Sequence, residues 1–285
     1  MTLHTGMLQT VDETKGFLTL SKSTCHKAPA VIAHLVPIVK RYLDKYPVSR
    51  LHLQSDSPTA QYRKKNLFYS MCEVLTRMFS QITSIIFNYS EGGHSKGGRD
   101  GLGGWAKNTA NDAAKHGRDV ATFEALVALL KEKSKNVLIE TIDESDIDYY
   151  RNLIPKDLRT FEGTMQMHQF TWSKEFPRQI FFNSVSCYAC AAGTKCSHFS
   201  LPGSPWTFYM PPEETNKEVR KRKGPEDRDQ IQDNPAKKPQ NSETTSSKDV
   251  DVGDWVVLRF GCFWYPGQYE FYSSHRFHLF VLINH

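Results

Sequence analysis

The chain has 285 residues, enough for one large domain or one domain with appendages, and its hydrophobic content of 39% is enough to build a core. The formal net charge of +5 is a mild basic excess, which permits nucleic-acid binding without requiring it. No apolar run reaches the roughly 18 residues of a membrane span and no secretion signal is recognisable, so we expect neither a membrane protein nor a secreted one.

The N-terminal part of the chain predicts two strands, a helix and a third strand. Residues 2–10 and 17–21 have strand character and flank the hydrophilic sequence DETKG, which is typical of a hairpin turn. Apolar residues then recur at helical spacing over about 28–45. A short strand follows, in which leucines alternate with polar residues, and it ends at Asp56.

The middle of the chain continues to alternate between helices and strands. This alternation predicts an α/β fold in which helices cover a sheet, and ligands of such sheets bind beyond the carboxyl ends of the strands. The predicted elements are a helix from about 61, a strand at 82–89, a helix around 102–113, a helix at 121–133, a strand at 137–141 and two strands within 163–186.

Two acidic residues stand at the predicted carboxyl ends of neighbouring strands. Asp56 and Glu91 are 35 positions apart, and carboxylates placed in this way could share one divalent metal. Burying Asp56 without a partner would be costly, so the residue is solvated, paired or bound to metal. It could equally cap the helix that follows, which is an ordinary role for aspartate.

A glycine-rich loop follows the strand that ends near Glu91. Between Glu91 and Gly104 the chain holds seven glycines together with His94, Lys96 and Asp100. Glycines allow unusual backbone angles and a close approach to a ligand, although a flexible connector would have the same composition. The spacing does not match the phosphate-binding P-loop or the dinucleotide-binding pattern.

The sequence Cys187-x2-Cys190-x5-Cys196-x-His198 supplies three thiolates and one imidazole. These are the ligands of a tetrahedral structural zinc site, and the clustering suits an intracellular metal site better than a disulfide framework. The alternative is a set of unrelated buried cysteines.

The C-terminal part of the chain changes in composition. Residues 211–250 are almost free of apolar side chains, which predicts a disordered basic linker. The run Arg220–Lys223 within it is compatible with nuclear import or with an ordinary solvated linker. Residues 251–285 predict a short β module.

Several stretches of the chain resemble a family of transposase-derived proteins. The resemblance covers about residues 2–200 together with the later segment VGDWV. Members of this family look like DDE-type transposases, which have a ribonuclease-H-like fold. The stretches that carry the resemblance are LHTGMLQ, AHLVPIVKRYLDKYP, LQSDSPTAQYRKKNLFY, NYSEGGHSKGGRDGLGGWAK and SCYACAAGTKCSHF.

The resemblance implies roles for the residues around the two acids. In DDE enzymes one Asp ends a central strand and a Glu follows about 35 residues later, an interval that Asp56 and Glu91 match. Asp100 is a competing candidate for the last acid. These acids would hold Mg²⁺ or Mn²⁺, and the positions that would contact nucleic acid are His94, Lys96 and Lys107.

The chain departs from the family pattern at two glycines and at one strand. Ser57 and Ser95 stand where the family has glycine, which could strain the backbone. A ribonuclease-H-like sheet also has a central first strand that carries the first Asp, and no such strand precedes residue 2. Two-metal phosphoryl transfer needs acids to hold both ions, so we expect weak catalysis or none.

The sequence thus predicts a ribonuclease-H-like mixed sheet flanked by helices and lacking its first strand. The expected function is that of a nuclear, transposase-derived, DNA-binding protein with an incomplete centre for metal-dependent phosphoryl transfer. The alternative is a non-catalytic, zinc-stabilised module that binds proteins. The predicted parts are a ribonuclease-H-like domain at 1–160, a β-hairpin and zinc-knuckle segment at 161–210, a linker at 211–250 and a β module at 251–285.

Overall fold

The structure is a computed structural model, and it describes most of the chain in several stretches. Within residues 98–208, side chains are described from residue 101 onward. After residue 208, only the side chain of Val281 is described. The predicted linker at 211–250 lies outside the described residues. The described stretches are 1–10, 13–55, 62–90, 98–208, 255–260, 263–268 and 277–284.

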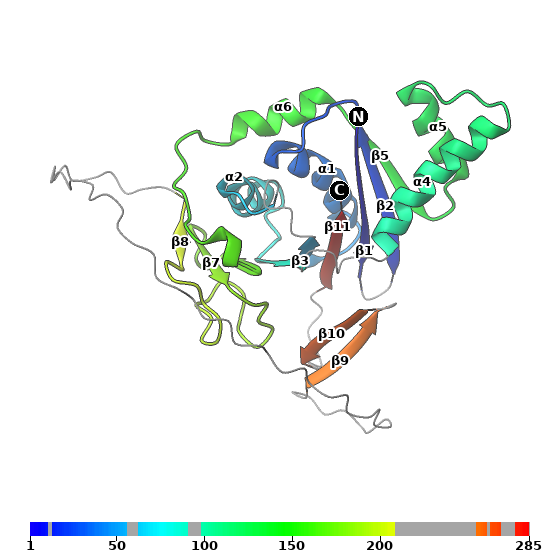
Figure 1. Ribbon diagram of the computed structural model, residues 1–285. Helices are drawn as coiled ribbons and strands as arrows, with labels where there is room; N and C mark the ends of the chain where they lie inside the picture. Colours follow the sequence, from blue (N-terminus) through cyan, green and yellow to red (C-terminus); the bar gives the residue numbers. More distant parts are fainter. Residues whose placement is uncertain are drawn as a thin grey trace, which may run out of the picture.

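A mixed sheet of nine described strands forms the centre of the fold (Figure 1). Its strand order is β5-β2-β1-β11-β3-β4-β6-β7-β8. The strands are, in that order, Val137–Ile142, Thr14–Ser21, Thr2–Gln9, Phe277–Asn284, Val48–Ser55, Ser84–Tyr89, Gln169–Ser173, Gln179–Asn183 and Trp206–Thr207.

The strands of this sheet run in both directions. The N-terminal hairpin β1–β2 is antiparallel, as the sequence predicts, and β5 pairs parallel with β2. At the centre, β11, β3 and β4 are mutually parallel, and the hairpin β6–β7 continues the sheet in antiparallel pairing. A mixed α/β architecture is therefore present, as expected from the alternation of helices and strands.

Strand β11 lies between β1 and β3, although it comes from the C-terminal end of the described chain (Figure 1). It pairs antiparallel with β1 and parallel with β3. The sequence analysis recognised no first strand, and the lack of this strand would leave an unpaired edge beside the strand predicted to end at Asp56. The structure differs at this point, since β11 pairs with both neighbouring strands and leaves no open edge between them.

The C-terminal residues also divide between two sheets. The sequence predicted one short β module for 251–285. Strands β9 (Trp255–Phe260) and β10 (Phe263–Gln268) do form their own antiparallel pair, but β11 belongs to the large sheet.

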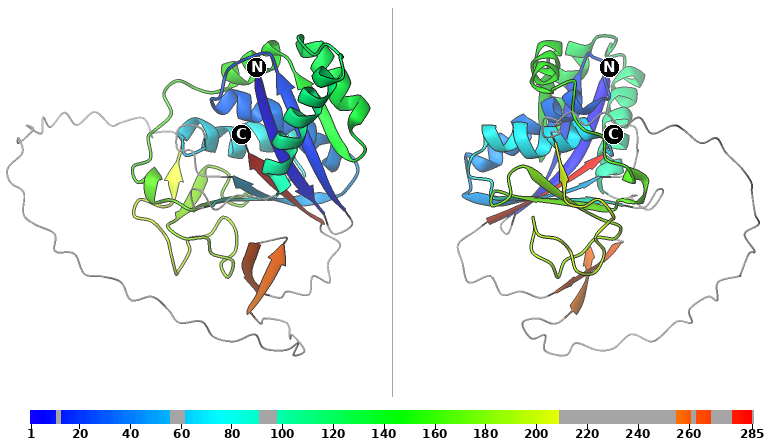
Figure 2. Two further views of the ribbon diagram at one scale, coloured as in Figure 1. Left: turned by 45° about the vertical axis from the view of Figure 1, so that its right-hand side comes forward. Right: turned by 90° about the vertical axis from the view of Figure 1, so that its left-hand side faces the viewer.

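Helices cover both faces of the large sheet (Figure 2). On one face, α1 (Ala28–Leu43) contacts the helical segment that begins at Lys65, and it also contacts α6 (Glu144–Leu153). On the other face, α4 (Gly98–Lys115) lies over β1, β2 and β11 and packs against α5 (Phe123–Lys133). None of the described helices is long and apolar enough to cross a membrane.

The alternation of side chains along β2 explains the two covered faces. Phe17 belongs to the main hydrophobic core, whereas Leu18 and Leu20 belong to a second, smaller core cluster. Because successive side chains of a strand point to opposite faces, each of these faces needs its own cover. The second cluster continues through Ala106 of α4 and Leu130 of α5.

The remaining helical segments extend the cover over the main core. The helix that begins at Lys65 consists of α2 (Lys65–Tyr69), a π-helical turn η1 (Ser70–Leu75) and α3 (Thr76–Met78). A short 3₁₀ turn, η2 (Thr164–Gln166), precedes β6.

Candidate metal centre

The segment after β7 carries the cysteine motif and is attached to the sheet at both of its ends. The amide of Ser184 donates to the carbonyl of Phe199 at 2.9 Å, and the amide of Leu201 donates to the carbonyl of Phe182 at 2.9 Å. Strand β8, which begins at Trp206, then pairs with β7. The segment is therefore a loop closed against one end of the sheet rather than a free extension.

The four predicted ligands converge in this loop. One ligand atom from each of Cys187, Cys190, Cys196 and His198 lies within 4.8 Å of all the others. The Nδ1 atom of His198 is 3.6 Å from the Sγ of Cys187 and 3.4 Å from the Sγ of Cys190. Ligands of a tetrahedral zinc with bond lengths of about 2.0–2.3 Å would be separated by about 3.3–3.8 Å. The cluster could therefore hold a metal ion such as zinc.

Backbone amides surround the sulfur atoms in two similar turns. The amides of Ala189 and Cys190 donate to the sulfur of Cys187. In the second turn the amides of His198 and Phe199 donate to the sulfur of Cys196, at 3.4 and 3.3 Å. Each of these two sulfurs thus accepts hydrogen bonds from the backbone amides two and three positions later, and such bonds hold a ligand atom in a fixed position.

The surroundings shift the pKa values of Cys190 and Cys187 in opposite directions. The backbone amide of Ser197, together with the Ser197 hydroxyl and His198, lowers the pKa of Cys190 to about 6 against the opposing effect of burial. Burial raises the pKa of Cys187, and the backbone amides partly oppose this. Cys190 is therefore a thiolate at neutral pH, which is the form that coordinates metals.

Gln169 on β6 attaches the turn that begins at Cys187 to the sheet. Its Nε2 donates to the carbonyl of Cys187 at 3.1 Å, and its Oε1 accepts from the amide of Cys187 at 3.1 Å. The same side chain donates to Oδ1 of Asn88 on β4 at 3.0 Å and accepts from Nδ2 of Asn183 on β7 at 2.7 Å. Because Gln169 is fully buried, these hydrogen bonds satisfy a group that would otherwise destabilise the core.

Sequence reasoning did not identify this amide network. The available signal was a polar amide inside or at the end of an otherwise apolar strand, as in SIIFNY, QFTW and QIFFN. A buried amide needs partners, so three such residues on neighbouring strands indicate a shared network.

The strands that precede the two predicted acids lie side by side. Ser55 of β3 is in register with Tyr89 of β4, and the amide and hydroxyl of Ser90 both bond to the carbonyl of Ser55, at 2.9 and 3.0 Å. Asp56 follows Ser55 directly in the sequence, and Glu91 follows Ser90. Both acids lie outside the described residues.

The other candidates around the acids are only partly described. His94 and Lys96 lie outside the described residues. Asp100 lies in the first turn of α4, but its side chain is not described. Lys107 is exposed on α4, where it can meet a ligand in solvent. The predicted acidic centre therefore stays a prediction.

Comparison with known proteins gives one result. No curated protein and no solved structure matches the chain. The model of a protein family described as a domain of unknown function, DUF8701, matches residues 1–181, which is more than half of the chain. The matched range includes the strands from β1 to β6, together with the helices between them, and ends within β7. The chain belongs to the DUF8701 family.

Proposed function

We propose that this chain is a transposase-derived, nucleic-acid-binding protein with a ribonuclease-H-like sheet and an incomplete centre for divalent metal. The observation that carries the proposal is the parallel trio β11, β3 and β4 beside the hairpin β1–β2. A ribonuclease-H-like sheet places its first strand centrally, beside the strand that ends at the second acid. The position of β11 between β1 and β3, the strand that precedes Asp56, supports the proposal.

The residue at the end of β11 supports an incomplete centre. Ile283 is in register with Ser55, so the next position, Asn284, stands beside the point where the chain continues to Asp56. An asparagine at this position offers a neutral amide where a carboxylate would be needed. Mg²⁺ and Mn²⁺ prefer carboxylate ligands, and two-metal phosphoryl transfer needs several of them. We therefore expect nucleic-acid binding without efficient strand cleavage.

A comparison of the wild-type chain with Asn284→Asp tests this proposal. Both proteins are titrated with Mn²⁺ by calorimetry, and both are tested for binding and cleavage of labelled DNA. We expect wild type to bind DNA without cleaving it, and Asn284→Asp to bind Mn²⁺ at least tenfold more tightly. Asn152→Asp, which adds the same charge at an exposed position of α6, is the matched control. Absence of DNA binding would contradict the proposal, as would efficient cleavage by wild type that Asp56→Asn abolishes.

We further propose that the ion held by the cysteine cluster is Zn²⁺ in a structural role. Three sulfurs and one imidazole nitrogen form a soft donor set, which favours Zn²⁺ over Mg²⁺ or Ca²⁺. Four protein ligands complete a tetrahedron and leave no position for a substrate. Elemental analysis of the purified protein tests this, with one equivalent of zinc as the expected result.

A second candidate function is a zinc-stabilised module that binds proteins. The observation that favours it is a group of exposed apolar side chains within the cysteine segment: Val185 is 51% exposed, Tyr188 43% and Phe199 39%. Where such side chains form one contiguous patch, the patch is suited to bind another protein. A photo-crosslinker at position 188 should capture a partner, and that partner should bind the purified chain. Replacing all three residues by serine should weaken this binding at least tenfold while zinc is retained.

Nuclear localisation is part of the proposal and depends on Arg220–Lys223, which lie outside the described residues. A fluorescent fusion of the full chain is expected in the nucleus. Substituting these four residues by glutamine should redistribute the fusion to the cytoplasm. An unchanged distribution would show that import does not depend on this run.

A further inference from the structure

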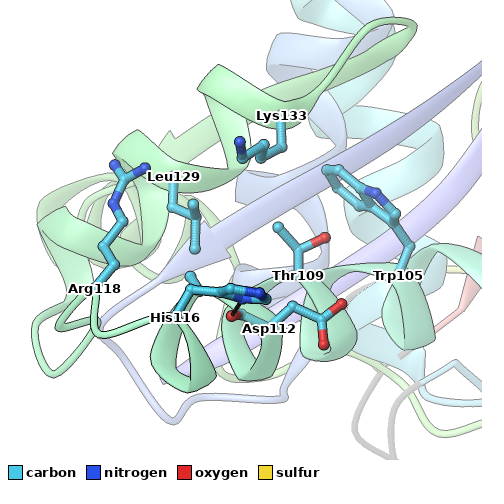
Figure 3. A pocket seen from close by; sticks show the side chains of 8 residues that line it. Trp105, Thr109, Asp112, His116, Arg118, Leu129 and Lys133 are labelled. Carbon is cyan, nitrogen blue, oxygen red and sulfur yellow. Dashed lines mark hydrogen bonds between the residues drawn. The ribbon is translucent and has the colours of Figure 1, made fainter.

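A pocket of about 500 Å³ lies between α4 and α5, on the sheet face opposite α1 (Figure 3). This volume is within the range of small-molecule sites, which is about 300–1,000 Å³. The pocket is separate from the cysteine cluster, with which it shares no residue. Its lining residues are Trp105, Thr109, Asp112, Ala113, His116, Arg118, Leu129 and Lys133.

Trp105 provides an aromatic wall at one end of this pocket (Figure 3). The residue is half-buried and packs against the second core cluster, which includes Leu18 and Leu130. This packing restrains the indole, so a ligand does not have to order it on binding. A restrained aromatic ring at a pocket wall is suited to stack on a planar ligand.

The opposite side of the pocket carries an excess of positive charge. Arg118 is 2.6 Å from a carboxylate oxygen of Glu132, and Lys133 is 3.3 Å from the other oxygen of the same carboxylate. Two cations therefore share one anion. The acidic lining residue Asp112 has its own cation, Lys115, at 3.6 Å, so the five groups together carry a net charge of +1.

His116 adds a further polar group at this side. Its Nδ1 is 2.7 Å from the backbone carbonyl of Asp112. A carbonyl can only accept, so Nδ1 carries the proton and Nε2 is the nitrogen that can accept one. Together with Arg118 and Lys133, the ring gives this end of the pocket three groups that can donate to an anion when the histidine is protonated.

The pocket lies along α4, the first described helix after β4. Helix α4 begins at Gly98, shortly after β4, and it contacts β1 and β11. Trp105 is seven residues further on, which corresponds to roughly 10 Å along a helix that rises about 1.5 Å per residue. A strand of nucleic acid that extends from the pocket along α4 would therefore reach the N-terminal turn of this helix.

We propose that this pocket binds one nucleotide of a single-stranded nucleic acid, with the base stacked on Trp105 and a phosphate at Arg118 and Lys133. The inference rests on the proposed nucleic-acid-binding function and adds a binding site to it. The planar wall and the basic side match the two chemical parts of a nucleotide. Sequence tolerance is expected, because every base can stack and the pocket wall is an indole.

Fluorescence anisotropy with fluorescein-labelled dT12 and rU12 tests the site in the full chain. Stacking contributes about 1–3 kcal/mol per base, so Trp105→Leu should weaken binding about 5- to 150-fold, and Trp105→Phe much less. Arg118→Gln with Lys133→Gln should weaken binding and lower the dependence of log Kd on log salt by about 0.7 per lost phosphate contact. Arg151→Gln removes a cation from an exposed ion pair on α6 and should have no effect.

The oligonucleotide can be varied as well as the protein. A change in the oligonucleotide tests base stacking without any effect on the folding of the chain. Oligonucleotides with abasic sites should bind wild type more weakly than dT12, and Trp105→Leu should abolish this difference. If wild type binds neither oligonucleotide, the proposed function itself fails. If wild type binds but the pocket variants bind equally well, or if abasic sites have no effect on wild type, only the inference about this pocket is overturned.

Discussion

The backbone amide of Gly193 donates a hydrogen bond to Oγ1 of Thr171 on β6, at 3.1 Å. Gly193 belongs to the loop between Cys190 and Cys196 and has a φ of +76°, a conformation that disfavours residues with a Cβ. A Cβ at this position would lie 2.2 Å from Oγ of Ser173 and 2.7 Å from its backbone nitrogen. The loop between Cys190 and Cys196 thus touches the sheet at a point where only glycine fits.

Gly193→Ala should therefore detach the loop between Cys190 and Cys196 from β6. Both the φ angle and the contact with backbone atoms oppose the new methyl group, so relaxation requires the loop to move. We expect a loss of about 2–4 kcal/mol in the free energy of unfolding, with weaker zinc binding, both measured by urea denaturation and competition with a chelator. Gly117→Ala is the matched control, since Gly117 has a φ of +81° but nothing within 4 Å of the added Cβ. Its expected loss is about 1 kcal/mol.

Removal of the metal should loosen the cysteine segment and spare the centre of the sheet. Without the ion, only the hydrogen bonds to β6 and β7 hold the cysteine segment against the sheet. Hydrogen exchange is expected to increase over 184–208 after chelation, with little change in β3 and β4. Cys196→Ser should have the same effect and lose the zinc. Cys25→Ser, outside the cluster, should retain one equivalent of zinc. Loss of zinc from this variant would disprove the assignment of the four ligands.

The elements of the fold that depend on local patterns could be predicted from the sequence. The hairpin β1–β2, helix α1 and strand β5 appear close to their predicted ranges, because periodicity and turn residues determine them locally. Helix α6 was not predicted, although Asp143 and Asp146 form a capping box at its start. The signal was present in the sequence DESDI, but the helix is short and mostly polar, with only Ile147 and Tyr150 buried, so few apolar residues mark it.

Long-range placement could not be predicted in the same way. Nothing in the sequence FHLFVLIN states that it pairs with β1 and β3, because strand pairing depends on the neighbours that a strand meets. The cysteine cluster could be predicted because all four ligands lie within twelve residues, where spacing alone limits the geometry. Its anchor, Gln169, could not, since it reaches the cluster from another strand.

The buried hydroxyl of Tyr42 predicts a dependence of stability on pH. Tyr42 is 3% exposed, and its hydroxyl has no hydrogen-bond partner among the described residues. Burial raises its pKa to about 12, with a smaller contribution from Glu13. The unfolded chain ionises first as the pH passes about 10, so the contribution of the neutral hydroxyl is complete below pH 10 and is lost as the pH rises toward 12. The expected loss at pH 11 is about 1 kcal/mol.

Tyr42→Phe should remove this part of the pH dependence. It also removes an unsatisfied buried hydroxyl, so stability at pH 7 should be unchanged or higher by up to about 1 kcal/mol. Urea denaturation at pH 7, 9.5 and 11 measures both effects. Tyr149→Phe, at a position that is 55% exposed, should follow the wild-type profile. A loss of more than 1 kcal/mol at pH 7 in Tyr42→Phe would mean that the hydroxyl has a partner.

The placement of β11 predicts that the large sheet depends on the C-terminal strand. Among the described strands, only β11 joins β1 to β3, so its loss would divide the sheet and expose two apolar edges that favour aggregation. Val281 of β11 is fully buried, and Val281→Asp would place an unpaired charge there. We expect a loss of roughly 3 kcal/mol or more in the free energy of unfolding, together with aggregation on heating.

Val185→Asp, at a position that is 51% exposed, should change stability by less than about 0.5 kcal/mol. Thermal denaturation followed by circular dichroism and light scattering compares the two variants. Equal stability of Val281→Asp and wild type would show that β11 does not pair between β1 and β3 in solution.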